Sequence, residues 1–238
     1  SLGGGMQMFD EGNPTPLGIV AMLVAGMLLL VSFKVVSDWL EDTDNPTVTL
    51  EFSYMPAGST ERTTATVVIE LYEDDAPLHV ENFLILAEDS RYDFTIFHRI
   101  IDGFMMQGAD FENRDGSGGY TGKWFGYCNG QEFDSSGNRY SPDTCGQSSW
   151  TLPDEADNGH LHVPGALAMA KTSSPNTGSS QFYIVPEDST PDHLDGVHTV
   201  FGMVVEGLDH VTAISEVPTD GNDRPIDEVR LVSVTVND

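Results

Sequence analysis

The feature that most restricts the possible folds is a series of short strand-like segments, interrupted by only two segments with helical spacing. Residues 48–54 (VTLEFSY) and 63–71 (TTATVVIEL) alternate apolar and polar side chains, which is the period of a strand with one buried face. The dipeptide Asp102-Gly103 is typical of a tight hairpin turn and predicts that the segments on either side of it pair. In chain order, the predicted strands are residues 48–54, 63–71, 97–101, 104–109, 165–170, 180–185, 198–205 and 229–236. Many strands with few helices predict a closed β-barrel capped by helices.

The two helical segments are residues 74–90 and 207–217. In the first of them, Asp75 is the predicted N-cap, and Pro77 falls in the first turn, where its missing amide hydrogen is tolerated. The apolar positions of this helix share one face, which consists of Val80, Phe83, Leu84 and Ala87. We expect both helices to cap the barrel.

An uncharged run precedes the first strand at residues 17–33 (LGIVAMLVAGMLLLVSF). About 17 to 20 residues of helix span roughly 25 to 30 Å, close to the thickness of a bilayer core. A buried globular helix would show a polar face, which this run lacks. A cleaved signal peptide is the nearer alternative, although Asp10 and Glu11 precede the run where basic residues are usual. The predicted organisation is an N-terminal tail at 1–15, a transmembrane anchor at 16–36, an acidic linker at 37–46 and one domain at 47–238.

The charge balance excludes one class of partner. Lysine and arginine number 10 against 38 aspartates and glutamates, so the formal net charge is −28. Such a surface repels phosphate backbones and anionic lipid headgroups. We therefore expect no nucleic-acid partner.

The two cysteines lie in a Gly/Ser/Asn-rich stretch, GYCNGQEFDSSGNRYSPDTCGQ, which is typical of an exposed loop. A disulfide between Cys128 and Cys145 would close a loop of about 18 residues, worth on the order of 3 kcal/mol in the chain-entropy model. Two unpaired thiols are the alternative, and a zinc site lacks the usual C-x-x-C spacing. Disulfides persist in oxidising compartments, which favours an extracytoplasmic domain. Lys34, the cation beside the uncharged run, favours the opposite orientation by the positive-inside rule.

Several motifs in order resemble one family. The stretch FHRIIDGFMMQGAD (97–110) resembles the signature of the cyclophilins, the peptidyl-prolyl cis-trans isomerases, and the likeness continues through GSGGYTG (116–122), PGALAMAKTSSPNTGSSQFYI (164–184) and HLDGVHTVFGMVVEGLDHV (193–211). It covers roughly residues 63–236. The resemblance implies a closed eight-stranded antiparallel β-barrel with two α-helices and a substrate groove on the outside of the barrel.

The resemblance also implies roles for individual residues. Arg99 corresponds to the catalytic arginine of the family, and Phe104, Met105, Tyr183 and Leu194 correspond to the walls of its proline pocket. The remaining substrate-binding positions that it implies are His98, Gln107, Ala170, Lys171, Thr172, Gln181, His193 and His198.

The chain departs from the family pattern at four of its positions. Asp102 stands where proline is usual, and Tyr183 adds a hydroxyl where the family has phenylalanine. Lys171 replaces an asparagine, and His193 stands where many members carry a tryptophan that favours cyclosporin. Residues 120–150, cysteines included, resemble an insertion relative to short cyclophilins.

The chemistry explains why an arginine belongs among apolar residues. When an X-Pro bond twists, the prolyl nitrogen loses amide resonance and gains a lone pair, to which a guanidinium can donate. Arginine suits this role because it stays charged and presents a rigid fork. A plain two-residue turn at Asp102-Gly103 would place Arg99 opposite Met106, whereas one extra residue would place it opposite Gln107, on the same face. We predict the longer turn, with Gln107 orienting the guanidinium.

Three functions fit the sequence. The first is an isomerase that rotates X-Pro bonds and assists the folding of exported or membrane proteins. The second is a proline-peptide binding module of the same fold with little or no catalysis, and the third is a structural extracytoplasmic domain. Retention of Arg99, Gln107 and the pocket residues favours the first, with proline-containing polypeptides as partners. We expect a monomer without a cofactor, and no metal, because no spacing such as H-E-x-x-H occurs among the histidines.

Overall fold

The computed structural model describes residues 9–10, 13–14 and 45–237. The predicted anchor at 16–36 and most of the linker at 37–46 lie outside these residues. Two short strands, β1 (Phe9–Asp10) and β2 (Asn13–Pro14), pair antiparallel with each other. Asn45–Asp238 form a separate compact unit. Among the helices of the described residues, none combines the length and the apolar character needed to cross a bilayer.

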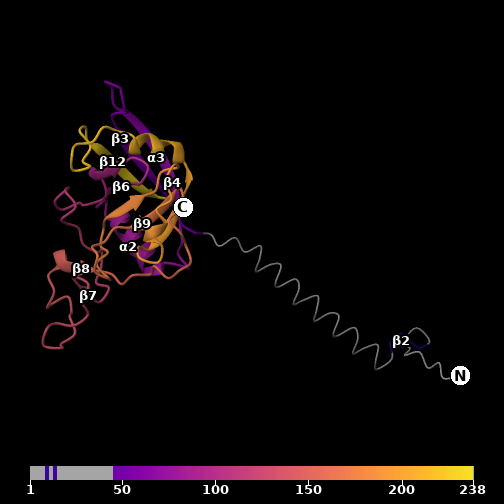
Figure 1. The fold of residues 1–238 in the computed structure, drawn as a ribbon. Helices are drawn as coiled ribbons and strands as arrows, with labels where there is room; N and C mark the ends of the chain where they lie inside the picture. Colours follow the sequence, from indigo (N-terminus) through magenta and orange to yellow (C-terminus); the bar gives the residue numbers. More distant parts are fainter. Residues whose placement is uncertain (1–8, 11–12, 15–44, 238) are drawn as a thin grey trace. The chain divides into compact units, whose positions relative to one another are not determined.

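Eight antiparallel strands close into a barrel in the order β10-β6-β5-β12-β3-β4-β11-β9, which confirms the predicted eight-stranded barrel (Figure 1). The barrel strands are β3 (Thr47–Tyr54), β4 (Thr63–Leu71), β5 (Thr95–Ile101), β6 (Met105–Gly108), β9 (Ala166–Met169), β10 (Phe182–Ile184), β11 (Val200–Glu206) and β12 (Val229–Val236). A further pair, β7 (Tyr127–Cys128) and β8 (Trp150–Thr151), belongs to the 120–150 region and forms its own two-stranded sheet. Figure 1 shows this pair and its loops beside the barrel rather than in its wall. Two short 3-10 helices lie at Gln147–Ser149 and Asp192–Leu194.

The strands near the site are buried on both faces. In β9, Leu167 and Met169 belong to the main core inside the barrel, whereas Ala166 and Ala168 belong to a second apolar cluster. Adjacent β10 alternates in the same way, because Phe182 and Ile184 join the main core and Tyr183 joins the second cluster. Successive side chains of a strand point to opposite faces, so the second cluster lies on the outside of the barrel wall. This outer cluster is where a groove on the barrel surface was expected.

Helices α2 (Pro77–Glu88) and α3 (Leu208–Ser215) both contribute to the core inside the barrel. The predicted N-cap of α2 is wrong, because the N-cap residue is Ala76 and no side chain caps it. The carboxylate of Glu155, far along the chain, instead accepts hydrogen bonds from the backbone amides of Leu78 (3.2 Å) and His79 (3.0 Å). A carboxylate at this position satisfies amides that have no partner within the helix and complements the helix dipole. Tertiary structure therefore supplies the cap that local sequence was expected to supply.

Replacing Glu155 with glutamine is expected to lower the free energy of unfolding by about 1–2 kcal/mol at neutral pH. Burial alone would raise the pKa of Glu155, but the hydrogen bond with the buried His79 ring (Nδ1 to Oε2, 2.6 Å) and those from the His79 and Leu78 amides outweigh it and lower that pKa. A depressed pKa in the folded protein means that the stabilisation is present above about pH 4.3 and is lost as the pH falls through the folded pKa. Urea unfolding of both proteins across pH 3 to 7 should therefore show a difference that disappears in acid. Glu88→Gln, at the other end of α2, is the matched control and should not destabilise; a constant difference at all pH values would contradict the capping role.

Candidate active site

The hairpin of β5 and β6 fixes the position of Arg99. The turn between them is Asp102–Phe104, closed by a hydrogen bond from the Phe104 amide to the Ile101 carbonyl (3.1 Å). Gly103 has a φ of 65° at the third position of this turn, a conformation that favours glycine. Arg99 pairs directly with Gln107, so the two side chains leave the same face of the sheet. The prediction of the longer turn is confirmed.

A second irregularity in β5 turns Arg99 outward. The register shifts between Phe97 and Arg99, so His98 is an extra, bulged residue. Because of the bulge, Phe97 and Ile100 can both face the main core although they are three residues apart. Opposite the bulge, a Cβ on Gly108 would lie 2.8 Å from the Ile96 carbonyl oxygen, which explains why a glycine is needed there. Arg99 therefore points away from the core.

The outward face of this sheet contains a hollow of about 240 Å³. Its walls include apolar groups of the outer cluster, and two of the ten lysines and arginines of the chain also line it. The lining residues are Arg99, Phe104, Met105, Gln107, Ala170, Lys171, Tyr183, Leu194 and His198, all of which are sequence-predicted site residues. A small apolar slot with convergent polar groups is the form expected of a small-ligand site.

A larger, more polar hollow of about 470 Å³ adjoins the first. Gln107, Ala170 and Lys171 line both hollows, and the predicted residues Thr172 and Gln181 line the second. The remainder of its wall comes from residues that were not predicted, namely Gly116, Ser117, Gly118, Gly119, Asn129, Gln131, Ser148, Thr151, Ser174, Thr177 and Ser179. Asn129, Gln131 and Ser148 belong to the 120–150 region, so the insertion forms part of the groove.

Two predicted site residues lie apart from both linings. His98 is buried in the bulge, where its Nδ1 has no hydrogen-bond partner among the described residues. His193 is exposed and stacks on Phe104, with ring centroids 5.8 Å apart, so it contacts a pocket wall without lining the hollow. The structure brings the other predicted positions together.

The polar partners of the site differ from the expectation. Gln107 donates from Nε2 to Gln181 Oε1 (3.0 Å), while Arg99 Nε lies 3.3 Å from Asp223 Oδ2. The Asp223 carbonyl also accepts from the Ile100 amide (2.8 Å), which holds this loop against β5. Within residues 45–237, Asp223 is the ion-pair partner that faces the guanidinium, and Gln107 is oriented by Gln181 instead.

Two buried or half-buried acids complete the electrostatics of the groove. Lys171 Nζ lies 3.4 Å from Asp154 Oδ2, and the lysine side chain is only 5% exposed. Asp110 is fully buried and accepts hydrogen bonds from backbone amides of the loop that follows it, including Gly116 (2.9 Å) and Gly118 (3.1 Å). Burial alone would raise the pKa of Asp110, but these hydrogen bonds lower it. An ionised carboxylate therefore holds the glycine-rich wall of the larger hollow in shape.

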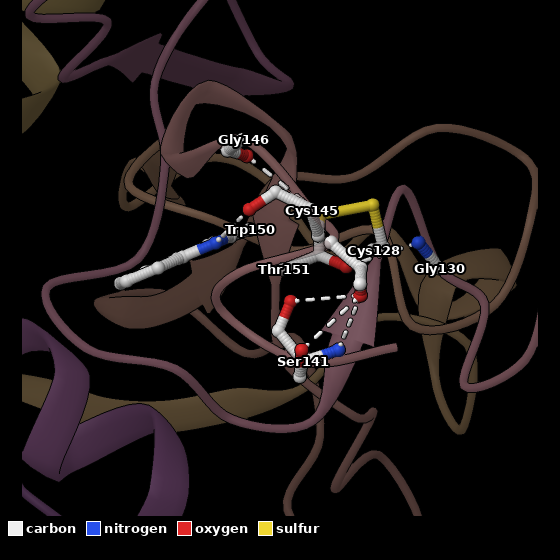
Figure 2. The surroundings of a disulfide bond; sticks show 8 residues. Cys128, Gly130, Ser141, Cys145, Gly146, Trp150 and Thr151 are labelled. Atoms are coloured by element: carbon white, nitrogen blue, oxygen red, sulfur yellow. Dashed lines mark hydrogen bonds between the residues drawn. A yellow bond between two sulfur atoms is a disulfide. The ribbon is translucent and has the colours of Figure 1, made fainter. Parts of the chain in front are cut away.

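The predicted disulfide joins Cys128 to Cys145, whose Cα atoms are 5.9 Å apart. Figure 2 shows the bridge with Gly130 and Trp150 beside it. Trp150 Nε1 donates to the Cys145 carbonyl (2.9 Å), and the Gly130 amide donates to Thr151 Oγ1 (3.0 Å). The bridge and these bonds tie the loop between β7 and β8 back to that strand pair, next to Asn129 and Gln131 in the groove wall.

Comparison with known proteins agrees with this geometry. The family model described as cyclophilin type peptidyl-prolyl cis-trans isomerase/CLD matches residues 59–236. Peptidyl-prolyl cis-trans isomerase-like 1 of Neurospora crassa is 38% identical over 177 residues, covering 74% of this chain and 91% of that protein. Peptidyl-prolyl cis-trans isomerase CYP18-1 of Arabidopsis thaliana is 36% identical over 169 residues, covering 71% and 88%. A crystal structure of a cyclophilin type isomerase from Cryptosporidium parvum, in the presence of the dipeptide Ala-Pro, is similar with a TM-score of 0.57 and 25% identity, over 79% of this chain and 99% of that one.

Proposed function

Because the chain belongs to the cyclophilin family of peptidyl-prolyl cis-trans isomerases, and is an enzyme that rotates X-Pro peptide bonds, we propose that Arg99 is its catalytic residue. The observation that carries this proposal is the position of Arg99 at the edge of an apolar slot lined by Phe104, Met105 and Leu194. In this proposal the slot holds the proline ring. The larger hollow receives the residues that precede the proline.

The proposed chemistry requires no covalent step. Unaided rotation of an X-Pro bond crosses a barrier of about 18–20 kcal/mol and takes tens to hundreds of seconds. The apolar slot holds the ring while the preceding carbonyl rotates, and the guanidinium donates to the prolyl nitrogen when that nitrogen becomes pyramidal. In the planar ground state the nitrogen lone pair is delocalised and accepts poorly from the guanidinium. The interaction therefore lowers the barrier to rotation rather than merely strengthening binding. Asp223, paired with Nε, leaves the other side of the guanidinium fork to face the substrate.

A protease-coupled assay on a short Ala-Pro-Phe peptide tests the activity in the full chain. We expect catalytic amounts of the protein to shorten the cis-to-trans phase well below the tens of seconds of the unaided reaction. A protein that binds the peptide but leaves this phase unchanged would instead be a proline-peptide binding module.

We further propose that the enzyme acts as a monomer on exported or membrane proteins, anchored through residues 16–36, with its domain outside the cytoplasm. The Cys128–Cys145 bridge supports an oxidising compartment, because such bridges persist there. The uncharged run supports the anchor. Alkylation of the native protein in membrane fractions, before and after reduction, tests both points. Thiols that react without a reductant would contradict the oxidising compartment. A protein recovered outside the membrane fraction would contradict the anchor.

A further inference from the structure

The hydroxyl that Tyr183 adds to the pocket wall is hydrogen-bonded to a buried histidine. Tyr183 is only 4% exposed, and its hydroxyl oxygen lies 2.7 Å from Nε2 of His162. The two rings stack, with centroids 5.8 Å apart and an interplanar angle of 12°. His162 lies on the segment before β9, lines neither hollow, and has a fully buried side chain. It is therefore a buried titratable group in direct contact with a wall of the proline slot.

His162 is fixed from its other side by Asp195. Both the backbone amide and the Nδ1 atom of His162 lie 2.8 Å from Asp195 Oδ1. Asp195 directly follows Leu194, another wall of the slot. The sequence of contacts Leu194-Asp195···His162···Tyr183 thus links two walls of the slot through one buried imidazole.

The chemistry of the three groups determines where the protons lie. The hydrogen bond from the His162 amide lowers the pKa of Asp195, so its carboxylate is ionised at neutral pH and can only accept. Nδ1 of His162 must then carry the proton, which leaves Nε2 as the acceptor for the Tyr183 hydroxyl. Burial raises the pKa of Tyr183, so the phenol remains protonated and donates. Every polar atom along this path is satisfied only while His162 is neutral.

Protonation of His162 would break this arrangement. Burial lowers the pKa of His162, and the facing Asp195 offsets that effect only in part. The other titratable groups near it are His193, which disfavours a positive charge on His162, and His198, whose ring meets Tyr183 edge-on at 5.7 Å. Once protonated, Nε2 donates to the Tyr183 oxygen instead of accepting from it, and the phenol hydrogen is left without an acceptor among the described residues.

We propose that Asp195 and His162 are positioning residues that hold the Tyr183 ring as a rigid wall of the proline slot, and that this wall loosens when His162 gains a proton. The proposal rests on the proposed function of the slot. A wall that holds the ring acts on the flat and the twisted bond alike, so its loss should raise KM more than it lowers kcat.

Steady-state kinetics of the full chain between pH 5 and 8 test the proposal. At pH 8, His162→Gln and Tyr183→Phe should each raise KM by roughly threefold to tenfold, with kcat within about twofold of wild type. Because burial lowers the pKa of His162 from its ordinary value of about 6.5, the KM of the wild type should rise toward that of Tyr183→Phe only at pH values below that, where the ratio between them should approach one. Titration of His198 affects both proteins alike and cancels in this ratio. His210→Gln, on α3 and outside both linings, is the matched control and should follow the wild type.

Histidine side-chain NMR gives a readout that does not depend on activity. Two-bond ¹⁵N–¹H correlations, assigned by comparison with His162→Gln, should show the proton of His162 on Nδ1 at pH 8. A proton on Nε2, or a KM ratio between wild type and Tyr183→Phe that is constant from pH 5 to 8, would overturn the proposed roles of Asp195 and His162. A wild-type protein without isomerase activity at any pH would count against the proposed function instead. The NMR result would still show whether His162 holds the Tyr183 hydroxyl as proposed.

Discussion

Replacing Arg99 with alanine is expected to lower kcat/KM for an Ala-Pro-Phe peptide by about 10²- to 10³-fold, the usual effect of removing one donor that acts on the transition state. The loss should fall mainly on kcat, because the apolar slot still holds the proline ring in the ground state. Arg99→Lys should recover only part of the rate, since a lysine keeps the charge but lacks the rigid fork.

The matched control for this experiment is Arg230→Ala on β12. Arg230 is an exposed arginine that pairs with Glu228 and lines neither hollow. We expect the kcat/KM of Arg230→Ala to equal that of the wild type within about twofold, because Arg230 lines neither hollow and an exposed ion pair contributes little to stability. Equal rates for Arg99→Ala and Arg230→Ala, with folding verified by circular dichroism, would show that the guanidinium beside the slot does not catalyse rotation.

Replacing Phe182 with alanine is expected to lower the free energy of unfolding by about 3–5 kcal/mol. Phe182 is fully buried at the centre of an aromatic cluster, with ring centroids 5.5 Å from Phe83, 5.6 Å from Tyr92 and 5.9 Å from Phe97. Its removal leaves a cavity that these rings from different elements cannot close together. Because Phe182 lies between Gln181 and Tyr183 on β10, isomerase activity should also fall.

Phe94→Ala provides the contrast for this prediction. Phe94 is 63% exposed, so the same change of side chain should cost about 1 kcal/mol or less. Urea unfolding monitored by tryptophan fluorescence measures both variants. Similar losses in the free energy of unfolding for Phe182→Ala and Phe94→Ala would mean that the core is not organised around the aromatic cluster.

Local sequence predicts the elements of this fold well where one face of a strand is buried. Strands β4 and β12 begin and end at the predicted residues. The register of the β5–β6 hairpin does not follow from local turn chemistry, because Asp102-Gly103 alone favours the two-residue turn; the longer turn is predicted instead from the requirement that Arg99 and Gln107 share a face. Strand alternation depends on near neighbours, which a single sequence displays directly.

The partners of the key side chains could not be predicted in this way. Asp223 reaches Arg99 from a loop more than a hundred residues later, and Glu155 caps α2 from a segment 77 residues after Leu78. Such contacts depend on how the barrel closes, and the sequence around Asp223 indicates only a turn. Strand alternation also could not reveal the bulge that buries His98. The available signal was that Phe97 and Ile100, three residues apart, are both apolar and both reach the core.

Two-dimensional exchange NMR of an X-Pro peptide with the full chain follows the rotating peptide bond and the walls of the slot in one experiment. Catalysis of rotation in this slot predicts that catalytic amounts of protein bring cis–trans exchange from tens of seconds into the subsecond range, a change of roughly 10²-fold or more. It also predicts that the methyl signals of Met105 and Leu194, on the walls of the slot, shift as the peptide binds. Accelerated exchange with those signals unmoved, or shifted signals with unaltered exchange, would contradict it.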